Sequence, residues 1–127
     1  SWHYAMDHID MDGGYTAGIE FLKDQTLPTA VVAFNDLSAF GLIIAFTENG
    51  LKIPDDISIV SFDNIRMSKY YNPSLTTVAA DYKKIAQLSI DKLTTLIDDP
   101  DLIGKESENI ILKPELIIRN STASVCL

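Results

Sequence analysis

The sequence predicts an α/β domain in which helices flank a parallel β-sheet, and two observations indicate it. Residues 29–34 and 57–62 are short, continuous apolar runs, a pattern typical of strands that are buried on both faces. Residues 37–48, between these runs, repeat apolar side chains at helical spacing. The three segments therefore form a strand–helix–strand unit, whose right-handed crossover joins two parallel strands.

The boundaries of the helices follow from the residues at their ends. Asn35 and Asp36 precede the central helix, and both residue types cap helix N-termini. Gly50 follows it, and glycine readily adopts the left-handed backbone that ends many helices. An earlier helix is predicted over residues 15–24, because its apolar side chains recur on one face.

The second half of the chain continues the α/β pattern. Residues 63–73 are predicted to form a loop with one turn of helix, and residues 75–79 a β-branched strand. Residues 81–97 form the longest predicted helix, which a Pro-containing stop ends. Residues 110–112 and 115–118 are apolar and separated by Lys-Pro, which predicts two short strands or one bent strand.

Composition and charge limit the class of protein. The 127 residues suffice for one ordinary domain, and 18 acidic against 10 basic residues give a net charge of −8. An acidic surface repels phosphate backbones and anionic lipid, so this segment is not expected to contact nucleic acid. No apolar run is long enough to span a bilayer. The single cysteine, Cys126, is consistent with a reducing compartment, and the absence of an initial Met suggests a piece of a longer protein.

Two polar residues directly follow the predicted buried strands, Asn35 after the first and Asp63 after the second. Ligands of open α/β sheets bind beyond the carboxyl ends of the strands. A carboxylate accepts hydrogen bonds from hydroxyls, and an amide both donates and accepts, so this pair suits a polyhydroxylated small molecule. The alternative is structural: Asn35 caps the helix and Asp63 starts a turn. The sequence alone leaves both interpretations open.

Aromatic residues occur in the same region, namely Phe62, Tyr70 and Tyr71. Aromatic rings stack on sugars, but adjacent tyrosines are also common in protein interfaces. From the residues alone we favour an interface.

Signals for catalysis and metal binding are weak. The chain lacks a Gly-x-Ser-x-Gly motif and a phosphate-binding loop. The spacing of His8, Asp10 and Asp12 partly imitates a calcium loop, but the twelfth position is Ile19 where a bidentate Glu is needed. We therefore expect no enzyme activity, no metal site and no cofactor.

Four ordered motifs resemble one protein family. Residues 28–41 contain an apolar strand, then Asn-Asp and Ala-x-Gly. Residues 50–64 read Gly-x-x-Ile-Pro-x-Asp-Ile-Ser-Ile-Val-Ser-Phe-Asp-Asn, residues 73–78 read Pro-Ser-Leu-Thr-Thr-Val, and residues 112–122 read Leu-x-Pro-x-Leu-x-x-Arg-x-Ser-Thr. The sequence resembles the effector-binding region of LacI/GalR-type bacterial transcriptional repressors, which share the type I periplasmic-binding-protein-like fold.

The resemblance implies a regulator in which a small-molecule effector, often a sugar, binds between two lobes. Asn35 and Asp63 fall on family positions that hydrogen-bond the effector, and Ile9 falls roughly where many members place an aromatic residue that packs on it. Four residues match surfaces through which these proteins form homodimers: Phe40, Ile44, Tyr70 and Tyr71. Ser61 departs from the family pattern, which has glycine there.

The resemblance also implies a division of the chain. Residues 1–74 and 107–127 correspond to the C-terminal lobe, and residues 75–106 to a crossover strand and helix of the N-terminal lobe. The helix at 81–97 would then expose an apolar face. Operator DNA would be bound only by an N-terminal helix-turn-helix domain absent from this chain, and the protein would be cytoplasmic, with no membrane partner.

Two alternatives to the repressor remain. An extracytoplasmic solute-binding protein of a sugar transport system has the same fold and the same kind of site. A flavodoxin-like or Rossmann enzyme would require a glycine-rich turn after a strand, and Gly13-Gly14 lacks the rest of that fingerprint.

Overall fold

The computed structural model describes residues 8–24, 26–102 and 109–124, so Cys126 lies outside the described residues. The chain forms two compact units. Unit 1 comprises Ser1–Ala79 and Leu116–Leu127, and unit 2 comprises Ala80–Glu115. None of the helices in the described ranges is long and apolar enough to cross a membrane.

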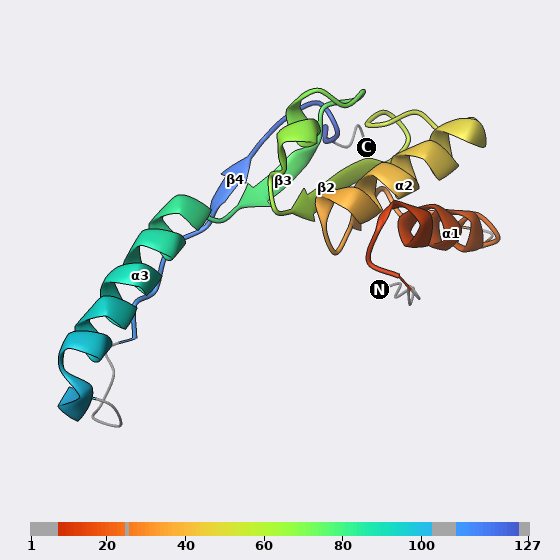
Figure 1. Ribbon diagram of the computed structural model, residues 1–127. Helices are drawn as coiled ribbons and strands as arrows, with labels where there is room; N and C mark the ends of the chain where they lie inside the picture. Colours follow the sequence, from red (N-terminus) through yellow and green to blue (C-terminus); the bar gives the residue numbers. More distant parts are fainter. Residues whose placement is uncertain (1–7, 25, 103–108, 125–127) are drawn as a thin grey trace. The chain divides into compact units, whose positions relative to one another are not determined.

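Two helices of unit 1 pack side by side, α1 (Met11–Phe21) and α2 (Asp36–Glu48) (Figure 1). Helix α2 agrees with the predicted helix. Helix α1 begins four residues before the predicted 15–24, because the Asp10 carboxylate accepts a hydrogen bond of 2.9 Å from the Gly13 N–H and caps it. The prediction missed this turn because its glycines are weak helix formers.

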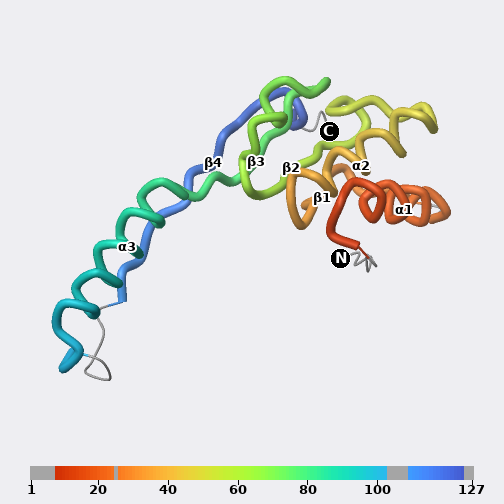
Figure 2. The backbone as a smooth tube through the Cα atoms, viewed as in Figure 1, coloured from red at the N-terminus to blue at the C-terminus, as the bar shows by residue number. Residues whose placement is uncertain are grey.

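The sheet of the chain contains β1 (Ala30–Val32), β2 (Ser58–Phe62), β3 (Thr76–Ala79) and β4 (Glu115–Ile117), in the order β1-β2-β3-β4. Strands β1, β2 and β3 are parallel neighbours, which confirms the predicted parallel α/β sheet. Figure 2 traces the backbone from β1 through α2 into β2. The 3-10 turn η1 (Arg66–Lys69) confirms the helical turn predicted after β2.

The core of unit 1 lies between α2 and one face of the sheet. Its largest fully buried apolar side chains are Phe40, Phe46, Ile57, Ile59 and Leu75. The prediction that the first strand is buried on both faces was wrong, because Val32 and Phe34 are 68% and 61% exposed. A hydrophobic run shows that a strand is apolar, but only the packing shows which face is covered.

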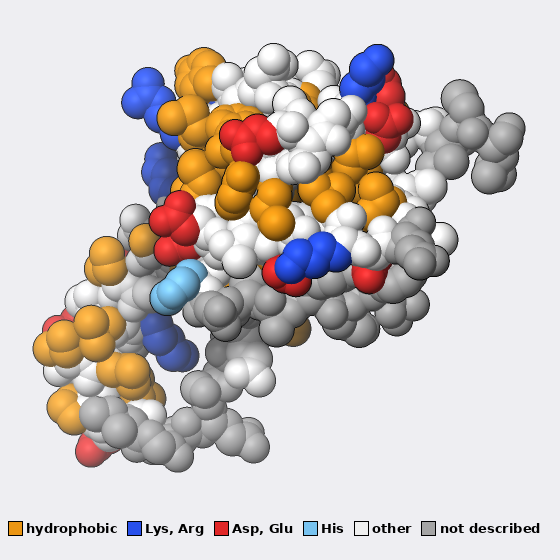
Figure 3. All heavy atoms as spheres, turned by 90° about the vertical axis from the view of Figure 1, so that its right-hand side faces the viewer, with side chains coloured by type: hydrophobic (Ala, Val, Ile, Leu, Met, Phe, Trp, Pro, Cys, Tyr) orange, Lys and Arg blue, Asp and Glu red, His pale blue; other side chains and the backbone are white. Residues whose placement is uncertain are grey.

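Large apolar side chains reach the surface at many positions, and Figure 3 shows a group of them, in orange, on one face.

The segment 110–112 is not a strand, so of the two short strands predicted at the C-terminal end only β4 forms.

Unit 2 contains the long helix α3 (Tyr82–Asp98) and the 3-10 turn η2 (Pro100–Leu102). The Asp81 carboxylate caps α3 by accepting a hydrogen bond of 2.9 Å from the Lys84 N–H. None of the residues of α3 is buried, and Ile90, Leu93 and Ile97 are 61%, 59% and 68% exposed. The apolar face predicted for this helix therefore lies exposed.

Candidate functional site

Asn35 and Asp63 lie at the same edge of the sheet. The parallel register pairs Val32 of β1 with Val60 of β2, and each polar residue follows its paired valine by three positions. The structure therefore places both residues at the carboxyl ends of neighbouring strands, where ligands of α/β sheets bind.

Asn35 connects this edge to the N-terminal side of α1. Its Oδ1 accepts a hydrogen bond of 2.8 Å from the Ser38 N–H, which caps α2, and its Nδ2 donates one of 2.9 Å to the Ile9 carbonyl. Asn35 and Ile9, which the resemblance places at the effector site, are thus joined by a hydrogen bond, and the Ile9 side chain is 59% exposed. A carboxamide has two N–H groups and two lone pairs, so these two bonds use half of its capacity. The capping role of Asn35 is confirmed and leaves room for a ligand role.

Asp63 and the following residue form a tight turn after β2. Asp63 has a φ of 102° and Asn64 a φ of 52°, values that favour glycine and that Asp and Asn tolerate best among the other residues. The Asp63 N–H donates a hydrogen bond of 3.0 Å to the Val78 carbonyl. Asp63 itself is half-buried and lies at the start of the turn. The chain therefore bends sharply at Asp63, where the sequence offered the start of a turn as the structural alternative.

Asp36 is a fully buried carboxylate, at 0% exposure, beside this edge. Its Oδ1 accepts hydrogen bonds from the Ser61 hydroxyl and from the Thr77 hydroxyl at 2.6 Å. Its Oδ2 accepts from the Ile65 N–H at 2.8 Å and from the Ser68 hydroxyl at 2.5 Å. Four donors offset the loss of hydration that a buried charge suffers.

Asp36 was predicted to be structural, as an acidic residue at the start of the central helix. The helical pattern did not indicate that its carboxylate is buried or that it accepts four hydrogen bonds. Ser61, which stands where the resembled family has glycine, was the available signal, because a hydroxyl inside an apolar strand needs a partner.

Arg119 is the second residue that sequence analysis missed. Its guanidinium donates one hydrogen bond of 2.6 Å to the Asn64 Oδ1 and another of 2.6 Å to the Leu75 carbonyl. Its backbone N–H donates 2.9 Å to the Thr76 hydroxyl. The C-terminal segment therefore contacts the turn that contains Asp63, although Asn64 and Arg119 are 55 positions apart.

The prediction that Phe40 lies on a dimer surface is corrected by its burial. Phe40 is 0% exposed and stacks on Tyr71, with ring centroids 4.2 Å apart and an interplanar angle of 24°. A side chain enclosed by its own chain has no surface with which to contact a second copy. Ile44 is half-buried.

The adjacent tyrosines differ in environment. Burial raises the pKa of the half-buried Tyr71. Tyr70 is 63% exposed, and the Lys69 Nζ lies 4.6 Å from the centre of its ring. The hydrogen bond and then the charge of Lys69 lower the pKa of Tyr70. Only Tyr70 presents most of its ring to solvent.

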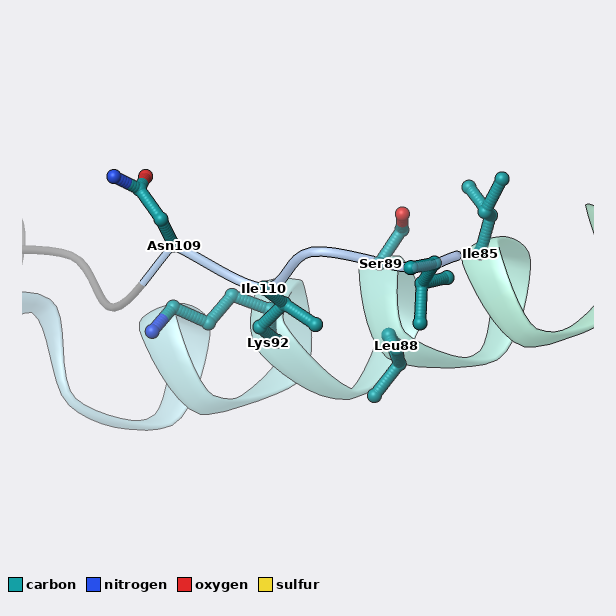
Figure 4. A pocket seen from close by; sticks show the side chains of 7 residues that line it. Ile85, Leu88, Ser89, Lys92, Asn109 and Ile110 are labelled. Carbon is teal, nitrogen blue, oxygen red and sulfur yellow. The ribbon is translucent and has the colours of Figure 1, made fainter. Parts of the chain in front are cut away.

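Unit 2 contains a separate open groove of about 470 Å³ between α3 and the segment after it (Figure 4). It is lined by Ile85, Leu88, Ser89, Lys92, Asn109, Ile110 and Leu112. Figure 4 shows the side chains of α3 beside those of Asn109 and Ile110. Its lining contains Ser89, Lys92 and Asn109 but no carboxylate. The edge with Asn35 and Asp63 combines a carboxylate and an amide at the carboxyl ends of parallel strands, so we take it as the better candidate site.

The parallel sheet has polar side chains at its carboxyl edge, the arrangement of α/β domains that bind small molecules. The model of one family, described as a periplasmic binding protein-like domain, matches residues 3–122. The chain belongs to this family.

Transcriptional regulators are among the relatives of this chain. The chain is 40% identical over 117 residues to the HTH-type transcriptional repressor PurR of Histophilus somni, covering 92% of this chain and 34% of the relative. A LacI family transcriptional regulator from Enterococcus faecalis with bound ribose is 39% identical, with a TM-score of 0.81 over 91% of this chain and 42% of that one. The lac repressor dimer bound to operator and an anti-inducer is 30% identical, with a TM-score of 0.80 over 91% of this chain and 39% of that one.

These relatives confirm the resemblance to LacI-type repressors. The chain corresponds to the C-terminal part of their effector-binding domain, and it spans about a third of the length of the curated relative.

Proposed function

We propose that this chain is the effector-binding part of a cytoplasmic, non-enzymatic transcriptional regulator and that its effector is a carbohydrate. The observation that carries the proposal is that Asn35 and Asp63 each follow the carboxyl end of one of two neighbouring parallel strands. A relative with 39% identity contains bound ribose, which supports a sugar as the ligand class.

In this proposal the Asp63 carboxylate accepts hydrogen bonds from sugar hydroxyls. The unused N–H and lone pair of the Asn35 amide bind a further hydroxyl, and the exposed Ile9 side chain packs on an apolar face of the sugar. The effector binds one arrangement of two lobes more tightly than the other and thereby shifts their populations. The change in DNA affinity equals this difference in effector affinity, and DNA is bound by an N-terminal helix-turn-helix domain outside this chain.

Unit 2 (Ala80–Glu115) is proposed to belong to the N-terminal lobe and unit 1 to the C-terminal lobe. The boundaries expected at residues 75 and 107 move to Ala79 and Glu115. Leu75 lies in the core of unit 1, and β3 pairs with β2 in its sheet. The exposed apolar face of α3 supports a partner for this helix in the complete regulator.

Asp63→Asn in the full-length protein is expected to weaken ribose binding by about 10- to 100-fold, because one or two charge-assisted hydrogen bonds are lost. Asparagine also tolerates the positive φ at this position, so the turn is retained. Isothermal titration calorimetry with D-ribose measures the effect.

Asp55→Asn is the matched control, because it removes the same charge from an exposed position away from the edge. Ribose affinity should remain unchanged in this variant. Equal affinity of the Asp63 variant and the unaltered protein would refute the role of Asp63, and absence of ribose binding by the unaltered protein would count against ribose as the effector.

We also propose that the regulator is a homodimer and that Ile44, Tyr70 and Tyr71 lie at its interface. Tyr70→Asp is expected to shift the full-length protein from dimer to monomer in sedimentation velocity, since a charge replaces an exposed ring in the interface. Leu27→Asp, at another partly exposed apolar position, should leave the dimer intact. An unchanged sedimentation profile of the Tyr70 variant would exclude this surface.

A further inference from the structure

The turn after β2 is held by hydrogen bonds to all three of its backbone N–H groups. The Asp63 N–H donates to the Val78 carbonyl at 3.0 Å, and the Asn64 N–H donates to the Thr77 hydroxyl at 3.2 Å. The Ile65 N–H donates to the Asp36 carboxylate at 2.8 Å. The acceptors come from β3 and from α2. The backbone of this turn is therefore fixed from two neighbouring elements.

The conformation needs such support. Two consecutive residues other than glycine have a positive φ, 102° at Asp63 and 52° at Asn64. Residues in such sparsely populated regions persist where the surroundings determine them, and they occur often at ligand sites. Nothing in the local sequence favours this conformation over an ordinary turn except the tolerance of Asp and Asn.

The side chain of Asn64 is held as well. The guanidinium of Arg119 donates to the Asn64 Oδ1 and to the Leu75 carbonyl, both at 2.6 Å. Its planar fork joins two acceptors at fixed geometry, and the backbone N–H of the same residue is bonded to Thr76. Arg119 thus fixes Asn64 to the start of β3.

We propose that Arg119 is a positioning residue for the ligand site: through Asn64 it holds the turn that presents Asp63, without itself touching the ligand. This rests on the proposed role of Asp63 in effector binding. Arg119 is half-buried, and its guanidinium donates hydrogen bonds to Asn64 and to Leu75.

The test is a double-mutant cycle in the full-length protein with D-ribose as the probe. Arg119→Gln removes the charged fork, and Asn64→Gly removes its acceptor while allowing the backbone φ of 52°. Each change is expected to weaken ribose binding by about tenfold, the equivalent of one charge-assisted hydrogen bond. The double variant should be no weaker than either single variant, because both changes remove the same interaction.

A second readout does not depend on a ligand. Hydrogen-exchange mass spectrometry should show faster exchange of a peptide covering residues 62–70 in Arg119→Gln. Ser121→Ala is the control for general destabilisation, since the Ser121 hydroxyl is buried and bonded to Ile59 and Thr76 but not to the turn. It should lower the midpoint of urea unfolding without changing ribose affinity or exchange in that peptide.

Unchanged ribose affinity in Arg119→Gln would overturn the proposal, as would independent, additive effects of the two changes. If the unaltered protein does not bind ribose, the sugar proposal fails, and the exchange of the 62–70 peptide then decides whether Arg119 holds the turn.

Discussion

Asp36→Ala is expected to lower the free energy of unfolding by about 3–5 kcal/mol, because buried donors lose their charged acceptor. The carboxylate accepts four hydrogen bonds at 0% exposure, and alanine accepts none. The three hydroxyls can rotate toward other acceptors, but the Ile65 N–H cannot. Each buried donor left without a partner costs about 1–3 kcal/mol. Urea denaturation of the full-length protein measures the loss.

Two further variants separate this network from a simple charge effect. In Asp36→Asn the amide oxygen can still accept from Ile65 and Ser68, while its NH₂ group can donate to the rotated hydroxyls of Ser61 and Thr77, so a loss of about 1–2 kcal/mol is expected. Asp12→Ala removes an exposed acid from the first turn of α1 and should cost at most about 1 kcal/mol. If Asp36→Ala is as mild as Asp12→Ala, Asp36 acts only through the charge at the helix N-terminus.

Gly41→Ala is expected to destabilise the protein by about 3 kcal/mol, at the upper end of the usual range for overpacking. A Cβ at this position would lie 2.0 Å from the Met11 carbonyl oxygen and 2.5 Å from the Tyr15 nitrogen. Both atoms belong to the backbone of α1, so no side chain can move aside, and the two helices must separate. Thermal unfolding followed by circular dichroism measures the change.

Gly18→Ala is the matched control in the same helix pair. Its new Cβ would lie 2.7 Å from the Ala45 Cβ, which moves only with the backbone of α2, and 3.4 Å from the movable Leu42 Cδ2. This single contact at 2.7 Å is less severe than the contacts at 2.0 and 2.5 Å in Gly41→Ala, so a smaller loss of stability is expected. Alanine is favoured over glycine within helices by about 1 kcal/mol, so helix propensity alone predicts that both changes stabilise. A stabilised Gly41 variant would show that α1 and α2 are not in close backbone contact.

The contact between these helices also bears on the candidate site. Helix α1 follows directly after Ile9 and Asp10, and the Ile9 carbonyl accepts the hydrogen bond of Asn35. Separation of α1 from α2 would therefore displace Ile9 from Asn35. The sequence contains the required glycines, but their spacing does not show which backbone they approach.

The sequence by itself determined the features that arise from neighbouring residues. Helices α2 and α3, the parallel strands and the cap at Asn35 were predicted, because periodicity and capping depend on residues within one or two turns. Parallel strands place their carboxyl ends at one edge, which is why Asn35 and Asp63 could be predicted as neighbours.

Only the tertiary structure decided the features that join distant residues. It buried Phe40 against Tyr71, left Val32 exposed, and joined both Asp36 and Arg119 by hydrogen bonds to the turn after β2. Asp36 bonds to residues 25–41 positions away, and Arg119 to one 55 positions away. Whether a polar group finds a hydrogen-bond partner, and whether an apolar side chain is buried, depends on the residues that the fold brings against it. The local sequence does not contain that information.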